Sequence, residues 1–218
     1  RDCLLSRGLG DVYKRQLFDG KDYASMSSSD PDKYKFIEYH KWKFKAKIFS
    51  PLAPLTVKRT PVLMTRVEYG FLGSYNKYKK SPFETFYMGG DGMSGYSSTY
   101  ATETIGLRGY ENGSIAGNGG YNSYGYAYSR LSMELRYPFL LEPSSTIYGL
   151  VFVEAGNAWR DLKDFNPFQL KRSAGVGVRI FLPMIGLMGI DWAYGFDRPD
   201  GYDQRGGSNF HFIIGQEF

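Results

Sequence analysis

The 218-residue chain has very few of the residues that build disulfides, metal sites or catalytic centres. Its one cysteine, Cys3, cannot form an intrachain disulfide. Its two histidines, His40 and His211, are far apart in the sequence and offer no metal-ligand spacing. No nucleophile–base pair and no phosphate-binding loop is present. The sequence therefore predicts a protein that is not an enzyme and that needs no metal and no cofactor.

Long hydrophobic runs are also missing, and their absence excludes a transmembrane helix, which needs about 18 or more apolar residues in a row. Aromatic residues and glycine are abundant instead, with 19 Tyr, 16 Phe, 3 Trp and 27 Gly. The mean hydropathy is −0.39. This combination is typical of a membrane β-barrel with a lipid-facing outside and a wet interior. A soluble β-sandwich is the alternative, although it rarely needs so many aromatic residues.

The net charge of +5 comes from 27 basic and 22 acidic residues. The basic residues are spread through alternating segments and do not gather into one patch with a nucleic-acid-binding motif. The sequence therefore predicts no binding to nucleic acid.

The first sixteen residues differ from everything that follows. They resemble the translated read-through of a sequencing adapter, and they lack the apolar centre of a signal peptide. We expect residues 1–16 not to belong to the native protein. Residues 17–218 are then the part of the chain from which the fold is inferred.

Charged and apolar side chains alternate most clearly between residues 33 and 49. Successive side chains of a strand point to opposite faces, whereas lysines at spacing two would be scattered around a helix. A lysine in hydrocarbon costs about 2–4 kcal/mol at the bilayer midplane, so the lysine face is expected to contact water. The lysines are Lys41, Lys43, Lys45 and Lys47, and the residues of the other face are Trp42, Phe44, Ala46 and Ile48.

The same alternation predicts roughly eight antiparallel strands in total, with long and short connections in turn. A long connection over residues 91–124 is rich in Gly, Ser, Asn and Tyr. The last segment has a length that suits a tilted strand crossing a bilayer. The fold class expected is therefore an all-β, transmembrane antiparallel barrel. The further strands are expected at residues 62–72, 83–88, 126–137, 147–159, 173–182, 187–196 and 210–218.

One short motif stands out in the long connection, where Arg108 lies between Leu107 and the pair Gly109 and Tyr110. Glycine next to the arginine lets the backbone fold tightly. The guanidinium group is a rigid fork of five donors that matches a carboxylate. An ordinary surface arginine in a solvated loop is the alternative.

These four residues resemble the (V/I/L)-R-G-(F/Y) motif in the sixth extracellular loop of BamA-type outer-membrane assembly factors. Further motifs of the family are similar to this chain, in the same order. They are the E-x-F-(F/Y)-x-G-G lead-in at residues 84–90, the F-x-(D/E)-x-G-x-x-W strand at 152–159, the R-x-S-x-G-x-G strand start at 172–177, and the last strand with Gly215. The resemblance covers about residues 34–218. It implies that residues 17–218 form the C-terminal part of an outer-membrane β-barrel domain, about half of a barrel of roughly sixteen strands.

The resemblance also implies a contact inside the barrel. In the family, the loop arginine reaches into the lumen and pairs with an acidic residue on the inner wall. Arg108 and Glu154 occupy the matching positions of this sequence, and Glu134 and Asp191 are the alternative partners.

The function implied is the folding and insertion of other outer-membrane proteins through a lateral seam between the first and last strands of the barrel. The expected partners are nascent outer-membrane proteins, lipoproteins of the assembly complex, outer-membrane lipid and lipopolysaccharide, in the bacterial outer membrane. Gly215 would be a weak point of the seam or a site of close packing. A two-partner secretion pore of the same superfamily and a small structural barrel are the alternatives. The residues assigned to the seam and to a C-terminal insertion signal are Phe210, Phe212, Ile214, Gly215 and Phe218.

Overall fold

A computed structural model describes residues 24–27, 30, 33, 37–54, 59–75, 78, 80–92, 103–115, 124–142, 145–183 and 186–215. The expectation about residues 1–16 and the assignment of Phe218 to the seam lie outside these residues. In the part of the chain that is described, no helix has the length and apolar character needed to cross a membrane.

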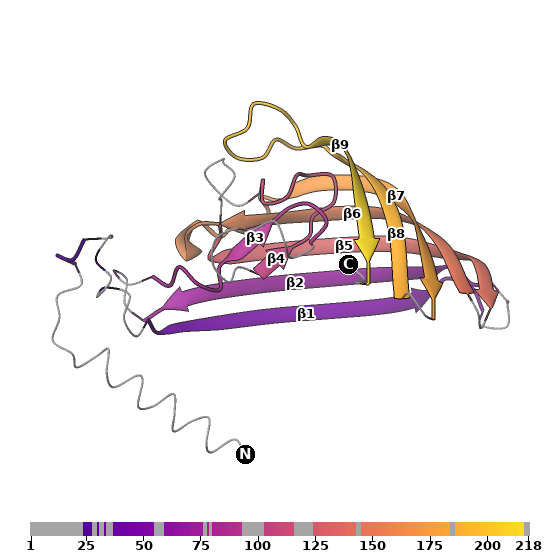
Figure 1. Cartoon of the computed structure of the whole chain (residues 1–218), viewed down its shortest axis with the longest axis horizontal. Helices are drawn as coiled ribbons and strands as arrows, with labels where there is room; N and C mark the ends of the chain where they lie inside the picture. Colours follow the sequence, from indigo (N-terminus) through magenta and orange to yellow (C-terminus); the bar gives the residue numbers. More distant parts are fainter. Residues whose placement is uncertain are drawn as a thin grey trace, which may run out of the picture.

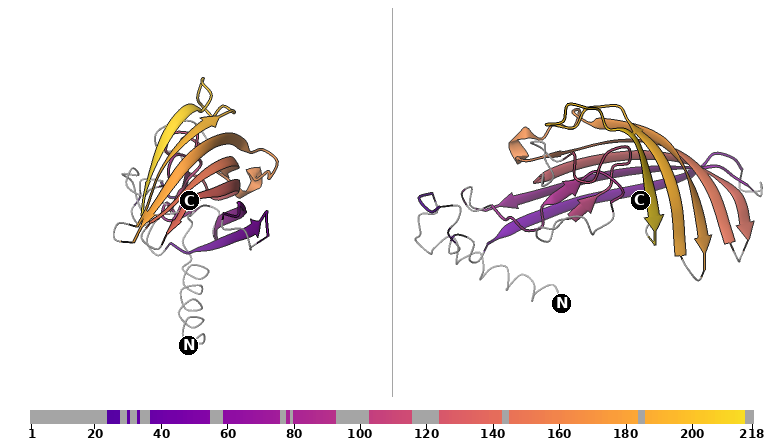
Figure 2. Two further views of the ribbon diagram at one scale, coloured as in Figure 1. Left: turned by 90° about the vertical axis from the view of Figure 1, so that its right-hand side faces the viewer. Right: turned by 45° about the horizontal axis from the view of Figure 1, so that its top comes forward.

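Seven strands form one sheet in the order β1-β2-β5-β6-β7-β8-β9, and every neighbouring pair is antiparallel (Figure 1). This arrangement confirms the all-β, antiparallel class expected from the sequence. The sheet curves strongly, and β1 and β9 are its two edges (Figure 2). The strands are β1 (Tyr39–Pro51), β2 (Val62–Ser74), β5 (Ala127–Glu142), β6 (Ser145–Trp159), β7 (Lys171–Leu182), β8 (Gly186–Gly195) and β9 (Gly207–Ile214).

The two faces of the sheet differ in polarity, as the alternation along β1 predicts. Trp42 of β1 is 69% exposed on the outer face, and Phe44 and Ile48 are also exposed. Arg66 and Glu68 of β2 are buried on the opposite, inner face. An apolar outside and a charged inside suit a wall between lipid and a wet lumen.

Connections of different length lie at the two ends of the sheet. Residues 75–126, 160–170 and 196–206 connect strands at one end. At the other end, β5 and β6 are joined by residues 143–144, and β7 and β8 by residues 183–185. The described parts of the long connection, which include the short strands at residues 86–88 and 103–105, lie on the concave side of the sheet (Figure 2).

The segment 83–88, which the sequence predicts to be one of about eight barrel strands, is not a strand of the large sheet, and that part of the prediction is wrong. Only β3 (Phe86–Met88) is extended, and it pairs in parallel with β4 (Glu103–Ile105) in a separate two-stranded sheet. Three residues are too few to cross a bilayer. The side chains are apolar because they pack in a core on the inner face. This core contains Leu72, Phe86, Met88, Ile105, Leu107, Tyr110, Ile115, Tyr128 and Ala158.

Candidate functional site

Residues 107–110 are held against the inner wall by their apolar neighbours. Leu107 and Tyr110 are buried in the core cluster on either side of Arg108. The backbone N–H of Leu107 donates to the carbonyl of Gly90 at 3.1 Å, which ties the motif to the end of β3. With Leu107 and Tyr110 packed in this core, the side chain of Arg108 points toward the strands of the sheet.

The Arg108 guanidinium is fully buried, and it contacts three carboxylates at once. Its Nη2 lies 2.7 Å from Oε1 of Glu154 and 2.5 Å from Oε1 of Glu134. Its Nη1 lies 2.9 Å from Oδ2 of Asp191. The structure thus brings Arg108 together with Glu154 and with both residues that the sequence left as alternative partners.

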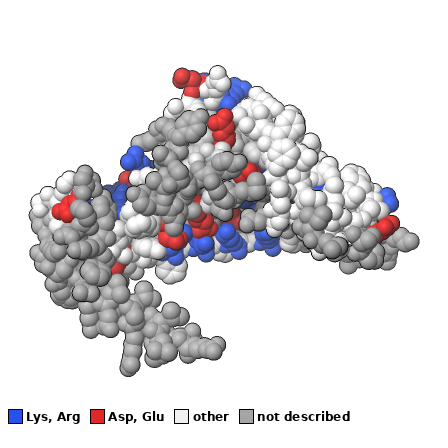
Figure 3. All heavy atoms as spheres, in the orientation of Figure 1, with Lys and Arg blue, Asp and Glu red and all other residues white. Residues whose placement is uncertain are grey.

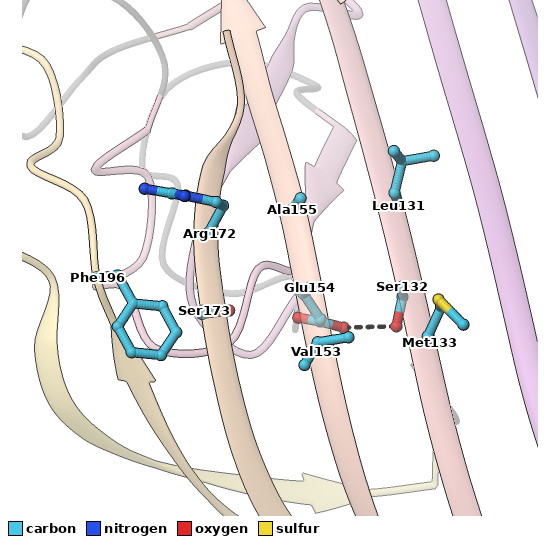
Figure 4. A pocket seen from close by; sticks show the side chains of 9 residues that line it. All are labelled: Leu131, Ser132, Met133, Val153, Glu154, Ala155, Arg172, Ser173 and Phe196. Atoms are coloured by element: carbon cyan, nitrogen blue, oxygen red, sulfur yellow. Dashed lines mark hydrogen bonds between the residues drawn. The ribbon is translucent and has the colours of Figure 1, made fainter. Parts of the chain in front are cut away.

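Glu154 accepts more hydrogen bonds than either of the other two carboxylates. Its Oε2 accepts a hydrogen bond from the backbone N–H of Arg108 at 2.9 Å, so it binds both the side chain and the main chain of the loop. Its Oε1 also accepts from Nη2 of Arg130 at 2.9 Å and from the hydroxyl of Ser132 at 3.1 Å (Figure 4). The glutamate therefore joins the loop to the wall strands β5 and β6.

Each carboxylate that faces Arg108 is also held by an arginine of the wall. Arg130 binds Glu154, Arg136 binds Glu134 at 2.7 Å, and Arg179 binds Asp191 at 2.7 Å. These pairs compensate the buried charges and fix the carboxylates in place. Among the described residues no cluster of His, Cys, Asp and Glu is arranged to hold a metal ion.

The environment of Arg108 keeps its charge. Burial alone would lower the pKa of the guanidinium, but the carboxylates of Glu154 and Glu134 more than offset this, and the pKa is raised above its usual range. The guanidinium also lies 3.5 Å from the centre of the Phe152 ring, an arrangement that favours a cation. The side chain of Arg108 therefore stays positively charged, and its charge leaves the carboxylates of the wall only if the loop moves.

The peptide group of Gly109 is bound by the last strand of the sheet. Its N–H donates to Nε2 of His211 at 2.9 Å, and its carbonyl accepts from Nδ2 of Asn209 at 3.0 Å. His211 and Asn209 are neighbours on the inner face of β9. Sequence reasoning missed this role, although both residues lie on the polar face of a recognisable terminal strand.

Tyr110 adds a contact to β7. Its hydroxyl donates to the carbonyl of Arg172 at 2.6 Å, and burial raises the pKa of Tyr110 to about 12. The residues of the motif therefore reach five strands of the wall from one short turn.

The residues assigned to the seam lie at the edge strand β9. Phe210, Phe212 and Ile214 point to the outer face and are exposed there. Gly215 follows the strand with a φ of +73°, and a Cβ added to it would meet nothing within 4 Å. Close packing against the described residues therefore does not explain this glycine, whereas its left-handed backbone does.

We expect Gly109→Ala to loosen the loop. Gly109 has a φ of +89°, and an added Cβ would lie 2.9 Å from the backbone nitrogen of Gly195. Strain and crowding together should lower the free energy of unfolding by about 1–3 kcal/mol, measured as thermal unfolding of the intact protein. Gly186→Ala is the matched control, because its φ is +92° with nothing within 4 Å of the added Cβ. Equal effects of the two substitutions would show that the loop is not packed against β8.

Comparisons with known proteins agree on the type of fold. Residues 33–218 match the family described as the Omp85 superfamily domain. The crystal structure of BamA from Haemophilus ducreyi lacking POTRA domains 1–3 is similar, with a TM-score of 0.54 and 22% sequence identity. The similarity covers 81% of this chain and 35% of that chain. No curated protein matches this sequence.

Proposed function

Because this chain belongs to the Omp85 superfamily, whose domain matches residues 33–218, we propose that the protein folds other β-barrel proteins and inserts them into the bacterial outer membrane. The chain forms an Omp85-type outer-membrane β-barrel wall. The observation that carries the proposal is the docked loop. It is held by three carboxylates of the wall through Arg108, and it holds the edge strand β9 through Gly109.

The edge of β9 supplies the chemistry that such a function needs. Among the described strands, β9 pairs with β8 only, which leaves its other edge for a further partner. Unpaired N–H and C=O groups of an edge can template a new strand. In lipid an unpaired edge is costly, so pairing with an incoming strand satisfies the polar groups along this edge and those along one edge of the incoming strand. Nascent outer-membrane proteins are the substrates that fit, with assembly lipoproteins and lipopolysaccharide as further proposed partners.

The loop gives this edge a fixed position. Asn209 and His211 bind the two ends of the Gly109 peptide group from the inner face of β9. The loop in turn cannot move without exposing or stranding the charge of Arg108. We infer that the docked loop keeps the edge strand in the geometry in which it accepts a partner.

The function is tested in cells that depend on the intact protein. Depletion should reduce the amount of folded outer-membrane proteins, and the wild-type gene should restore it. The double variant Asn209→Ala, His211→Ala should reach the membrane but restore about tenfold less, the factor that one to two lost hydrogen bonds represent. Gln169→Ala, which removes an exposed side chain of the β6–β7 connection, serves as the control.

A different outcome would identify the secretion alternative. If depletion leaves outer-membrane proteins folded and removes a single exported protein, the barrel is a secretion pore of the same superfamily. If neither class of protein changes, the assembly proposal is wrong.

A further inference from the structure

His211 holds the docked loop through an atom that can take up a proton. Its side chain is buried on the inner face of β9, and its Nε2 accepts the hydrogen bond from the N–H of Gly109 at 2.9 Å. A backbone N–H can only donate, so Nε2 is the unprotonated nitrogen of a neutral imidazole. An imidazolium has two N–H donors and no acceptor. Proton uptake at Nε2 and the hydrogen bond to Gly109 therefore exclude each other.

The charged side chains that act on His211 come from four different parts of the chain. The surface over β8 and β9 is uncharged where Figure 3 shows it, so these groups lie on the other, inner side of the sheet. Three of them are carboxylates, which favour a positive charge on the imidazole, and one is a guanidinium, which opposes it. They are Asp191 of β8, Glu154 of β6, Asp91 beyond the end of β3, and Arg108 of the docked loop.

The position of Asp191 shows how the wall can compensate its charge after the loop has moved away. Asp191 lies directly opposite His211 in the β8–β9 pairing, and its Oδ2 accepts from Nη1 of Arg108 at 2.9 Å. Movement of the loop takes Arg108 away and leaves Arg179 on this carboxylate. An imidazolium directly across from it then supplies a second cation, because opposite charges on facing strands attract. The same carboxylate can thus be compensated by Arg108 beside a neutral His211, or by a protonated His211 without Arg108.

We propose that His211 is a pH-sensitive switch for the docking of residues 107–110. With a neutral imidazole, Gly109 is bound and the loop is docked. With a protonated imidazole, the hydrogen bond is lost, the loop leaves the wall, and the edge strand β9 loses the contact that fixes its position. Docking favours the neutral form, so the stability that this contact contributes is present at higher pH and is lost as the pH falls. The inference needs only the docked loop and does not depend on the proposed function.

The test is hydrogen exchange of the intact protein in lipid nanodiscs between pH 7.5 and pH 5, since an exposed imidazole takes up its proton near pH 6.5. The protection of the peptide covering residues 105–110 is divided by that of the exposed peptide 160–170 in the same sample, because intrinsic exchange rates also change with pH. In the wild-type protein this protection ratio should fall about tenfold, the factor that one to two lost hydrogen bonds represent. It should recover when the sample is returned to pH 7.5.

Two variants show whether the response belongs to His211. His211→Gln keeps a side-chain acceptor that does not titrate, so its protection ratio at pH 5 should equal its own ratio at pH 7.5. His40→Gln removes the other histidine of the chain, on β1, and should respond to pH as the wild-type protein does. An equal fall of the ratio in His211→Gln would overturn the proposal, since acid would then act on the carboxylates.

A second measurement follows the proton itself in the wild-type protein and does not require any variant to fold. NMR of the His211 imidazole should show proton uptake over the same pH range in which the protection ratio falls. An imidazole that stays neutral down to pH 5, or one that takes up its proton while the ratio stays constant, overturns the proposal. Loss of protection in β5 and β6 together with the loop also overturns it, because acid would then unfold the wall. None of these results depends on assembly in cells, so a failure of the proposed function is recognised separately.

Discussion

Arg108→Ala is expected to abolish assembly activity and to reduce the stability of the barrel by about 3–5 kcal/mol. The substitution removes the group that three buried carboxylates share, and a buried charge that loses its partner is strongly destabilising. The loop also loses the ion pairs that anchor it next to Gly109, whose peptide group binds β9. The measurement is the unfolding free energy of the intact protein, together with the amount of folded outer-membrane proteins in cells that carry the variant.

Two further variants show whether the effect belongs to the docked guanidinium. Arg108→Lys keeps the positive charge, but its single ammonium group cannot replace the two guanidinium nitrogens that contact the three carboxylates. This variant should therefore be more active than Arg108→Ala but less active than the wild-type protein. Arg160→Ala removes an exposed arginine and should have no effect. Normal assembly by Arg108→Ala would contradict the role given to the loop.

Glu154→Ala is expected to cost more than Glu134→Ala or Asp191→Ala, with a loss in the range of about 3–5 kcal/mol. Glu154 alone among the three binds the main chain of the loop, and it also carries Arg130 and Ser132. Its removal leaves two buried arginines short of a partner. The three variants are compared by thermal unfolding in the same membrane environment.

A double-mutant cycle isolates the interaction energy between Arg108 and Glu154 from the other effects of each substitution. Arg108→Ala combined with Glu154→Ala should cost clearly less than the two single losses added together, because the residues are in contact. Strict additivity of the two losses, or a larger loss for Asp191→Ala, would show that Glu154 is not the main partner of the loop.

The strands were predictable because their signal is local. Lysines at every second position, with aromatic residues between them, fit one strand with a wet face and a lipid face. That inference needs only neighbouring residues, and the two faces of β1 confirm it. Local patterns of this kind could not show which carboxylate pairs with Arg108. Three strands each contribute one carboxylate, and sequence spacing cannot show that all of them meet at one point.

The parts that the sequence did not predict depend on contacts between distant residues. Gly109 and His211 are 102 positions apart, and only the curvature of the sheet brings them together. Phe86 and Met88 read as strand residues because they are apolar, but both faces of β3 are buried in the interior core. A short apolar segment has the same composition whether it is a strand facing lipid or a segment buried inside the barrel, so the sequence alone cannot distinguish the two.

The most direct test of the docked loop is hydrogen exchange in the intact protein in membranes. The amides of Arg108 and Gly109 donate to Glu154 and His211 in a buried site, so the peptide covering residues 105–110 should exchange slowly. The peptide covering the exposed connection 160–170 provides the fast reference. Slow exchange that becomes fast in Arg108→Ala is the result predicted. Exchange of residues 105–110 as fast as that of the reference in the wild-type protein would contradict the docking of the loop.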